Sequence, residues 1–385
     1  MGWYRRRILE TAIRLGVPAR IFGLVPFAHE TLTEHLKRKS EEGRKTGEVI
    51  HPQEVANNPL PVTAASPADL PDDRGWWGYS FRDVPSRTST PTILADLPDA
   101  TVCWYFHPEK PADFYPAIIS DDLRSVNLRE IRFRPGHAEV LRQSGEPARI
   151  EHGVWFAERV YDNHSHWLTA HLPKLLLIRE LGLLDRLLLP PKRSKVMDES
   201  LAMLGIDASS LPTFSLGRPL HAERLTVIET DRFRPDLLRR VPAAFGTPPR
   251  PAKGRRIFVS RAAAARRKLI DEESYYPLLA RHDIEPVRLE DLTFREQVAL
   301  MQDTELVVAP HGAGMTNMMF CPPGAKILEI ADPSFPNPNF YAVAAAMGHS
   351  YGLVPARSSG EGHELEKNLE TTTEALQRGL AALLD

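Results

Sequence analysis

The spacing of apolar residues in the last third of the chain alternates between the pattern of strands and that of helices. Short apolar runs occur at residues 256–260, 284–289, 306–309, 326–330 and 350–354, and helical patterns occur between them at 272–281, 294–302, 314–320 and 340–347. Thr293 precedes one of these helices, where its hydroxyl can cap the first turn. This alternation predicts a parallel sheet covered on both faces, and such sheets bind ligands at the carboxyl ends of their strands.

The middle of the chain carries β-rich runs at less regular intervals. Strands are expected at residues 101–106, 153–156, 159–161, 186–189 and 224–228, helices at 164–181 and 195–204, and a final amphipathic helix at 363–384. Four prolines between Pro242 and Lys253 indicate an interdomain linker. We therefore expect a partly irregular N-terminal extension at residues 1–95, a first α/β domain at 96–245 and a second at 250–385.

Composition narrows the class of protein. A chain of 385 residues is too long for one ordinary core, which agrees with two domains and a remainder. The formal net charge of −2 gives no reason to expect bulk binding to nucleic acid. Cys103 and Cys321 stand far apart, so neither a disulfide framework nor a zinc site is expected.

The N-terminus is basic and aromatic. Its first nine residues resemble the start of a signal peptide, but Glu10, Arg14 and Arg20 break the apolar stretch that should follow, so no signal peptide is expected. The chain contains no run of about 18 apolar residues, so no transmembrane helix is expected. The segment could lie on an anionic membrane surface, but we favour the alternative of an ordinary helix docked on the protein.

The sharpest local motif is the sequence His-Gly-Ala-Gly at residues 311–314, directly after a buried strand. Glycines let the backbone approach a ligand closely, and the following helix offers unpaired N–H groups, which suits a diphosphate. The motif is neither a Walker A loop nor G-x-G-x-x-G. The alternative is a tight strand-to-helix turn with a histidine there by chance.

Two further candidates lie at the ends of neighbouring strands. Ser260 and Arg261 end the first strand of the second domain and Arg266 and Arg267 follow, where guanidinium groups could bind phosphates; the alternative is a solvated basic loop. Glu329 lies near the end of a later strand, where a carboxylate could hold ribose hydroxyls; the alternative is a surface ion pair.

A polar turn at residues 161–168 precedes the long helix of the first domain. A histidine in this turn could act as general base on an acceptor hydroxyl, because its pKa lies near the working pH. With His171 it could also suggest a metal, but the spacing is not H-E-x-x-H and no metal is expected. The alternative is a histidine that only forms hydrogen bonds.

Taken together, these segments resemble glycosyltransferase family 61, which includes plant xylosyltransferases, animal O-linked N-acetylglucosaminyltransferases and bacterial proteins of polysaccharide biosynthesis. The residues that carry the resemblance are 163–168, 172–175, 259–261, 266–267, 271–273, 294–297, 308–320 and 324–330. Asp271 stands where the family often has Asn, and Lys174 where Arg is common. Residues 1–95 match no family pattern.

The resemblance implies a GT-B-like fold of two Rossmann-like domains facing across a cleft, with the last helix packing back on the first domain. It implies an inverting transfer of a sugar from a nucleotide diphosphate sugar, here taken as UDP-linked, to a glycan acceptor, without a metal or cofactor. The donor would be held by Ser260, Arg261, Arg266, Arg267, His311, Gly312, Ala313, Gly314, Asn317 and Glu329. The base would be His166, with Asp162 and Glu158 as substitutes.

A role in capsule or exopolysaccharide synthesis, in the cytoplasm at the inner face of the membrane, completes this expectation. Two other functions would use a similar site. A transferase of pyruvyl or phosphoryl groups would also need a phosphate loop and arginines. A glycan- or nucleotide-binding module would keep the fold without the base, and would bind the donor without turnover.

Overall fold

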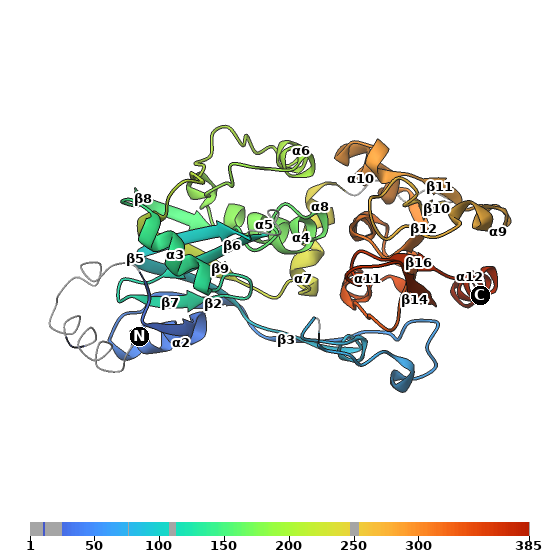
Figure 1. The fold of residues 1–385 in the computed structure, drawn as a ribbon, viewed down its shortest axis with the longest axis horizontal. Coiled ribbons are helices and arrows are strands. Elements are labelled where there is room, and N and C mark those ends of the chain that lie inside the picture. The colour runs from blue at the N-terminus through green and yellow to red at the C-terminus, as the bar shows by residue number, and fades with distance from the viewer. Residues whose placement is uncertain (1–10, 12–24, 76, 108–112, 247–253, 385) are drawn as a thin grey trace.

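The computed structural model describes residues 11, 25–75, 77–107, 113–246 and 254–384, and it shows a mixed α/β protein with two main sheets (Figure 1). The expected N-terminal surface helix and residues 247–253 of the expected linker lie outside the described residues. Among the helices of the described part, none is long and apolar enough to span a membrane.

The first sheet has seven strands and mixed directions. They are β1 (Ala28–Thr31), β2 (Gly47–His51), β5 (Thr92–Phe106), β6 (Phe114–Ile119), β7 (Arg124–Asn127), β8 (Ala148–Trp155) and β9 (Leu220–Glu229), in the order β1-β7-β6-β5-β9-β8 with β2 paired to β5. Only β1–β7 and β8–β9 are parallel pairs. The turn between β6 and β7 is too short for a crossover, so these strands can only be antiparallel. The expected Rossmann-like sheet is therefore absent from this domain as described.

Helices and short turns surround this sheet. They are α2 (Leu32–Glu41), α3 (Pro135–Gln143), α4 (His164–His166), a π-helical turn (Trp167–His171), α5 (Leu172–Glu180), α6 (Lys195–Met203), α7 (Pro235–Leu238), α8 (Arg240–Ala244) and a 3₁₀ turn at Leu184–Arg186. Two more 3₁₀ turns, Pro67–Asp69 and Phe81–Asp83, lie in a segment that leaves this domain. The segments α4, π-turn and α5 form the helix expected at 164–181. Residues 159–161 form a turn, with Val160 at φ 49°, instead of a strand.

The second sheet is wholly parallel, as the alternating pattern predicts. Its strands are β10 (Arg255–Val259), β11 (Glu285–Val287), β12 (Thr304–Pro310), β13 (Lys326–Ala331) and β14 (Ser350–Pro355), in the order β11-β10-β12-β13-β14. Its helices are α9 (Tyr276–Ala280), α10 (Phe294–Gln302), α11 (Asn339–Met347), α12 (Thr373–Leu384) and 3₁₀ segments at Glu272–Tyr275, Leu289–Asp291 and Ala313–Phe320 (η8). Thr293 caps α10 as predicted.

Side chains alternate across this sheet and build two cores. In β12, Leu306 and Val308 pack into a cluster under α9 and α12, while Val307 and Ala309 belong to a larger cluster with α10, η8 and α11. That larger cluster continues without interruption into the first sheet. The two sheets therefore share one hydrophobic core.

Residues 58–75 and 77–85, which we call the arm, also join the two sheets. The arm leaves the first domain after β3 (Glu54–Asn57), runs along the second sheet and returns through β4 (Ser86–Ser89), which pairs with β3 (Figure 1). Its Val62 N–H donates to the carbonyl of Tyr351, 2.8 Å away, and Thr63 Oγ1 accepts from Leu353 N–H. These bonds cover the outer edge of β14.

The expected boundary at residue 95 and the expected last helix both need correction. Residue 95 is not a boundary, because it lies inside β5, and β1 and β2 are strands of the first sheet. The last helix starts at Thr373 rather than at residue 363, because residues 368–370 form β16 (Asn368–Glu370), paired with β15 (Arg357–Ser359). This helix packs on β13 and β14 of its own sheet rather than on the first domain. At the contact, a Cβ on Gly379 would lie 2.5 Å from Val354, so only glycine allows the approach.

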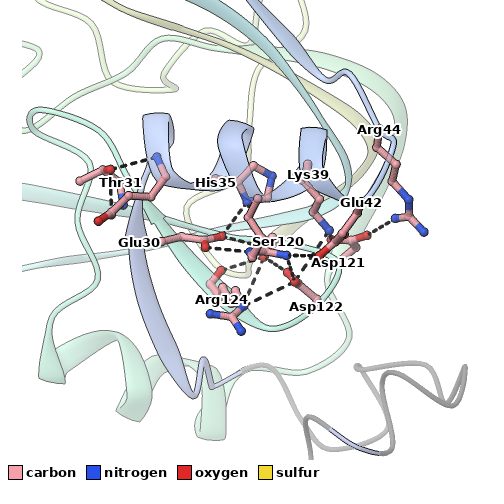
Figure 2. A network of polar contacts seen from close by, with 12 residues as sticks. Glu30, Thr31, His35, Lys39, Glu42, Arg44, Ser120, Asp121, Asp122 and Arg124 are labelled. Atoms are coloured by element: carbon pink, nitrogen blue, oxygen red, sulfur yellow. Dashed lines mark hydrogen bonds and ion pairs between the residues drawn. The ribbon is translucent and has the colours of Figure 1, made fainter.

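A buried charge network fixes α2 to the first sheet (Figure 2). Glu30 accepts from His35 Nδ1 and from Arg38 Nη2, each at 2.7 Å. Lys39, which is 2% exposed, donates to Asp121 at 2.8 Å in the turn between β6 and β7. The helix and the turn therefore hold each other through a desolvated ion pair.

This network gives a stability prediction. Replacing Lys39 by Met leaves Asp121 without its buried partner, and we expect the free energy of unfolding to fall by about 3 kcal/mol. Arg44 also contacts Asp121, at 3.4 Å, but its side chain is 59% exposed. Arg44→Met should therefore cost less than about 1 kcal/mol. Urea denaturation measures both, and equal losses would contradict the role given to the buried pair.

Candidate functional site

The strand order of the second sheet places the site. The chain leaves β10 toward β11 and then crosses back to β12 on the other side of β10. Open parallel sheets bind ligands at the carboxyl ends of the two strands where the direction reverses. Here Ser260 and Arg261 follow β10, and His311 and Gly312 follow β12. The fold thus brings together the two segments that the sequence indicated separately.

Arg261 lies directly against the glycine loop. A Cβ on Gly312 would stand 2.2 Å from Arg261 Nη1, so the guanidinium occupies the space that a side chain would need. Arg261 donates from Nε to the carbonyl of Arg267 at 2.9 Å and from Nη2 to that of Arg266 at 2.8 Å. Ser260 points to the same place, but its hydroxyl donates to Glu272.

Arg261 and Arg267 share a property that suits anion binding. Within the described residues, neither guanidinium forms an ion pair with a carboxylate. Burial lowers the pKa of both, that of Arg267 to about 10, where repulsion from Arg261 adds to the effect. Arg266, by contrast, is exposed and pairs with Glu366 at 2.7 Å. Two partly buried positive charges therefore stand beside the loop without an ion-paired carboxylate among the described residues.

A pocket of about 340 Å³ opens at this point. It is lined by His164, Val259, Ser260, Arg261, Ala263, Ala264, Leu289, Glu290, Gln297 and Gly314. All but one of these residues belong to the second domain. His164 comes from the first domain, so the pocket lies where the two domains meet.

Asn317 connects the two sides of the pocket. It is fully buried, its Oδ1 accepts from His164 Nε2 at 2.7 Å, and its Nδ2 donates to Gln297 Oε1 at 2.8 Å. Both ends of the amide are engaged. We therefore assign Asn317 to positioning His164, and not to contact with the donor as the resemblance implied.

Glu329 is also placed differently from the expectation. It is fully buried, and its two oxygens accept from His311 Nδ1 and from the hydroxyl of Tyr351, each at 2.5 Å. Because no part of the carboxylate is exposed, Glu329 orients His311 and does not hold ribose hydroxyls. Ala313 and Gly314 begin η8, where the first N–H groups of a helical turn have no partner within it.

The two histidines of the first-domain turn differ in which ring nitrogen is available. His164 donates from Nε2 to Asn317, which leaves the lone pair on Nδ1. His166 Nε2 lies 3.1 Å from Arg232 Nη1, and arginine can only donate, so that lone pair is used. Burial lowers the pKa of both rings, and the positive charge of Arg232 lowers that of His166 further. Both are therefore neutral near pH 7.

The two substitutes for the base have opposite environments. Asp162 is exposed, and burial of part of its carboxyl together with the negative charge of Asp113 raises its pKa. Glu158 is 1% exposed and forms ion pairs with Lys174 and with Arg129. Burial alone would raise the pKa of Glu158, but these cations outweigh it and hold the pKa at about 2. Glu158 is thus part of the core and has no free oxygen for a substrate.

His171 does not join a metal site. Its Nδ1 donates to the carbonyl of His166 at 3.1 Å, and its Nε2 accepts from Glu158 N–H at 3.2 Å. Across the part of the chain that the structure describes, no three His, Cys, Asp or Glu side chains lie close enough together to hold a metal ion.

Sequence reasoning missed Arg232 and Gln297. Arg232 follows β9, and the turn at 161–168 follows β8; the two strands are parallel neighbours, so their carboxyl ends meet. The sequence alone does not show that β8 and β9 are neighbours. Without that pairing, Arg232 is only a charged residue after a predicted strand, which is a common feature. Gln297 lies within the motif at residues 294–297, and its side-chain amide joins Asn317 of η8 to α10 and to the carbonyl of Leu289.

Comparisons with known proteins agree with this geometry. Residues 165–328 match the family model of Glycosyltransferase 61. An 82-residue segment is 34% identical to the EGF domain-specific O-linked N-acetylglucosamine transferase of Drosophila melanogaster, covering 21% of this chain and 16% of that protein. A 71-residue segment is 32% identical to the Beta-1,2-xylosyltransferase of Arabidopsis thaliana, covering 18% of this chain and 13% of that protein. The chain thus spans less than a fifth of the length of either relative.

The match over residues 165–328 confirms the resemblance to glycosyltransferase family 61 that the motifs indicated. The matched region starts at the histidine turn and contains the arginine segment after β10, the glycine loop and η8. Every element that surrounds the pocket, apart from His164 itself, lies within it.

The buried Glu158 gives a prediction that separates a structural role from a catalytic one. Glu158→Gln leaves Lys174 without a charge partner, and we expect the free energy of unfolding to fall by about 3–5 kcal/mol. Glu130 also contacts Arg129, at 3.7 Å, but it is 29% exposed. Glu130→Gln should cost less than about 1 kcal/mol, measured in the same denaturation series. A stable, inactive Glu158→Gln variant would instead favour a catalytic role.

Proposed function

We propose that this protein is an inverting glycosyltransferase that moves a sugar from a UDP-linked donor to a hydroxyl of a glycan acceptor. The observation that carries the proposal is the pair of partly buried guanidiniums, Arg261 and Arg267, that form no ion pair within the described residues and lie beside a glycine loop at the reversal point of a parallel sheet. The relatives support the reaction class, since by their names one transfers N-acetylglucosamine and the other is a xylosyltransferase.

The donor would bind with its diphosphate against the glycine loop. Arg261 and Arg267 would balance its charge, and the first N–H groups of η8 would donate to its oxygens. In the transition state negative charge grows on the leaving diphosphate, and donors fixed in advance stabilise that charge. These cations can do this without a metal ion, and we therefore propose a metal-independent reaction with no cofactor.

The acceptor would enter from the first domain, and its hydroxyl needs a base. The sequence indicated His166, but the free lone pair and the position in the pocket favour His164. In this proposal His164 Nδ1 removes the proton as the acceptor oxygen attacks the anomeric carbon. The bond to the diphosphate breaks on the opposite face, so the configuration inverts. His166 and the exposed Asp162 remain the alternatives.

Two wider parts of the proposal rest on the resemblance alone. One is the part of the GT-B description in which two domains face across a cleft with the donor between them; the first of these domains has a mixed rather than a Rossmann-like sheet. The other is a role in capsule or exopolysaccharide synthesis in the cytoplasm, at the inner face of a membrane.

One observation favours a second candidate function. The base first expected, His166, gives its lone pair to Arg232, and its substitute Glu158 is locked in ion pairs. A module that binds a nucleotide or glycan without turnover needs no base, so these contacts of His166 and Glu158 would not impair it. Donor binding without hydrolysis or transfer would identify that function.

A thermal-shift screen tests the donor site. A ligand that binds only the folded protein raises the melting temperature, and we expect UDP, among UDP, GDP, CDP, CMP and dTDP, to do so with EDTA present. Arg261→Met should abolish the shift. Gly312→Ala should weaken it as well, because the new Cβ displaces Arg261.

Gly145→Ala is the control for that series. A Cβ at Gly145 would meet no atom within 4 Å, and the residue lies outside the pocket, so the shift should persist. Absence of a shift with every nucleotide would overturn the donor assignment. A shift that EDTA removes would overturn metal independence.

The base assignment predicts how rate depends on pH. A general base acts when deprotonated, and burial lowers the pKa of His164 below its usual value of 6.5. As the pH is lowered, kcat/KM should therefore stay level past pH 6.5 and decrease only at a lower pH. His164→Gln keeps an amide donor for Asn317 but cannot take a proton. It should lower kcat by about 100-fold or more with little change in melting temperature. A larger loss in His166→Gln than in His164→Gln would return the role to His166.

A further inference from the structure

Arg232 is a buried positive charge held only by neutral groups. It is 7% exposed, and it donates from Nε to Thr169 Oγ1 at 2.6 Å, from Nη2 to Ser165 Oγ at 2.9 Å and from Nη1 to His166 Nε2 at 3.1 Å. A guanidinium has five N–H groups, so two remain after these three bonds. Over the described residues, no carboxylate pairs with it.

The neighbouring cations behave differently, which makes Arg232 an exception. Arg129 and Lys174 pair with Glu158, Arg159 pairs with Asp113 at 2.9 Å, and Arg87 pairs with Asp231 at 2.8 Å. Burial lowers the pKa of Arg232 to about 10, and repulsion from Arg129 contributes. An unpaired buried charge destabilises a fold, so its presence points to a partner outside the chain.

His166 adds a second unpaired group at the same place. Because Arg232 donates to its Nε2, the hydrogen of the neutral ring is on Nδ1. That Nδ1 is buried and has no hydrogen-bond partner among the described residues. A buried donor without an acceptor costs free energy, which an incoming acceptor would recover.

The position of Arg232 relates it to the acceptor rather than to the donor. It contacts Ser165 and His166, which directly follow the pocket residue His164. The donor arginines, Arg261 and Arg267, come from the other domain. A group bound at Arg232 would therefore lie on the first-domain side, next to the hydroxyl that His164 deprotonates.

We propose that Arg232, with His166, binds an oxyanion of the acceptor, so that the acceptor is an acidic glycan that carries a carboxylate or a phosphate near the reacting hydroxyl. Only the identification of the bound ligand as the acceptor rests on the proposed transferase function. The oxyanion site itself stands on the contacts of Arg232. A uronic acid and a sugar phosphate offer the same chemistry, and the experiment separates them.

The test compares D-glucuronate, glucose 6-phosphate and neutral glucose as probes, with binding followed by ligand-observed NMR on the full chain. The acid that matches the site should bind more tightly than glucose. Arg232→Met should weaken that binding by about tenfold or more, because it removes a charge-assisted hydrogen bond. Whichever probe responds identifies the source of the oxyanion.

Arg159→Met is the matched control, because Arg159 is a nearby arginine that already has a carboxylate partner. It should leave the binding of all three probes unchanged. The melting temperature and the probe affinity together separate a binding role from a structural one. Arg232→Met removes an unpaired charge but also three hydrogen bonds, so a change in melting temperature alone does not decide between the roles. A drop in melting temperature with unchanged probe affinity would overturn the proposal.

Three further outcomes test the proposal. If neither acid binds more tightly than glucose, Arg232 is not an acceptor site. The same holds if Arg232→Met weakens the binding of UDP as much as Arg261→Met does. If the wild-type protein does not bind UDP but binds an acid through Arg232, the donor proposal is wrong and the oxyanion site is supported. Failure of one is therefore distinguishable from failure of the other.

Discussion

One buried amide, that of Asn317, sets the relation between the two halves of the site. The carbonyl of Leu289 accepts from Gln297, Gln297 accepts from Asn317, and Asn317 accepts from His164. Each donor faces an acceptor, so the direction of the whole series is fixed. This direction decides which nitrogen of His164 carries the hydrogen. Loss of any member would leave a buried polar group unpaired, at a cost of about 1–3 kcal/mol.

Around that amide, the distribution of charge separates support from recognition. Glu158 and Lys39 are buried with their partners, and they join helices to the first sheet. Arg261, Arg267 and Arg232 are partly or wholly buried without a carboxylate, and all three lie near the place where the domains meet. Because an isolated buried charge is unfavourable, these positions are where a ligand contributes most.

The second sheet could be predicted almost completely, because each of its strands and helices has a local apolar period and the crossovers follow a general rule. The site residues at its carboxyl edge followed from the same rule. The first sheet could not, since its order depends on pairings between β5 and β9, far apart in the chain. Residues 159–161 look like a strand by composition, but the chain turns there at Val160.

Among the site residues, the errors have one physical cause. Glu329 and Asn317 stand at positions where ligands are usually held, yet the structure places partners against both. Their partners, His164 and Tyr351, come from other elements, and a local motif does not report such contacts. Arg232 was missed for the converse reason, because nothing in its own segment shows that it lacks a carboxylate.

The arm has a consequence for how the chain acquires its structure. Thr63 contacts Leu353, so this contact closes only when almost the whole chain exists. The strands of the first sheet, by contrast, are all present once β9 has been made. Contacts between residues far apart in sequence form slowly, and domains made first tend to fold first. The arm would then remain undocked after the first domain has folded, until the second sheet has formed and the edge of β14 is present.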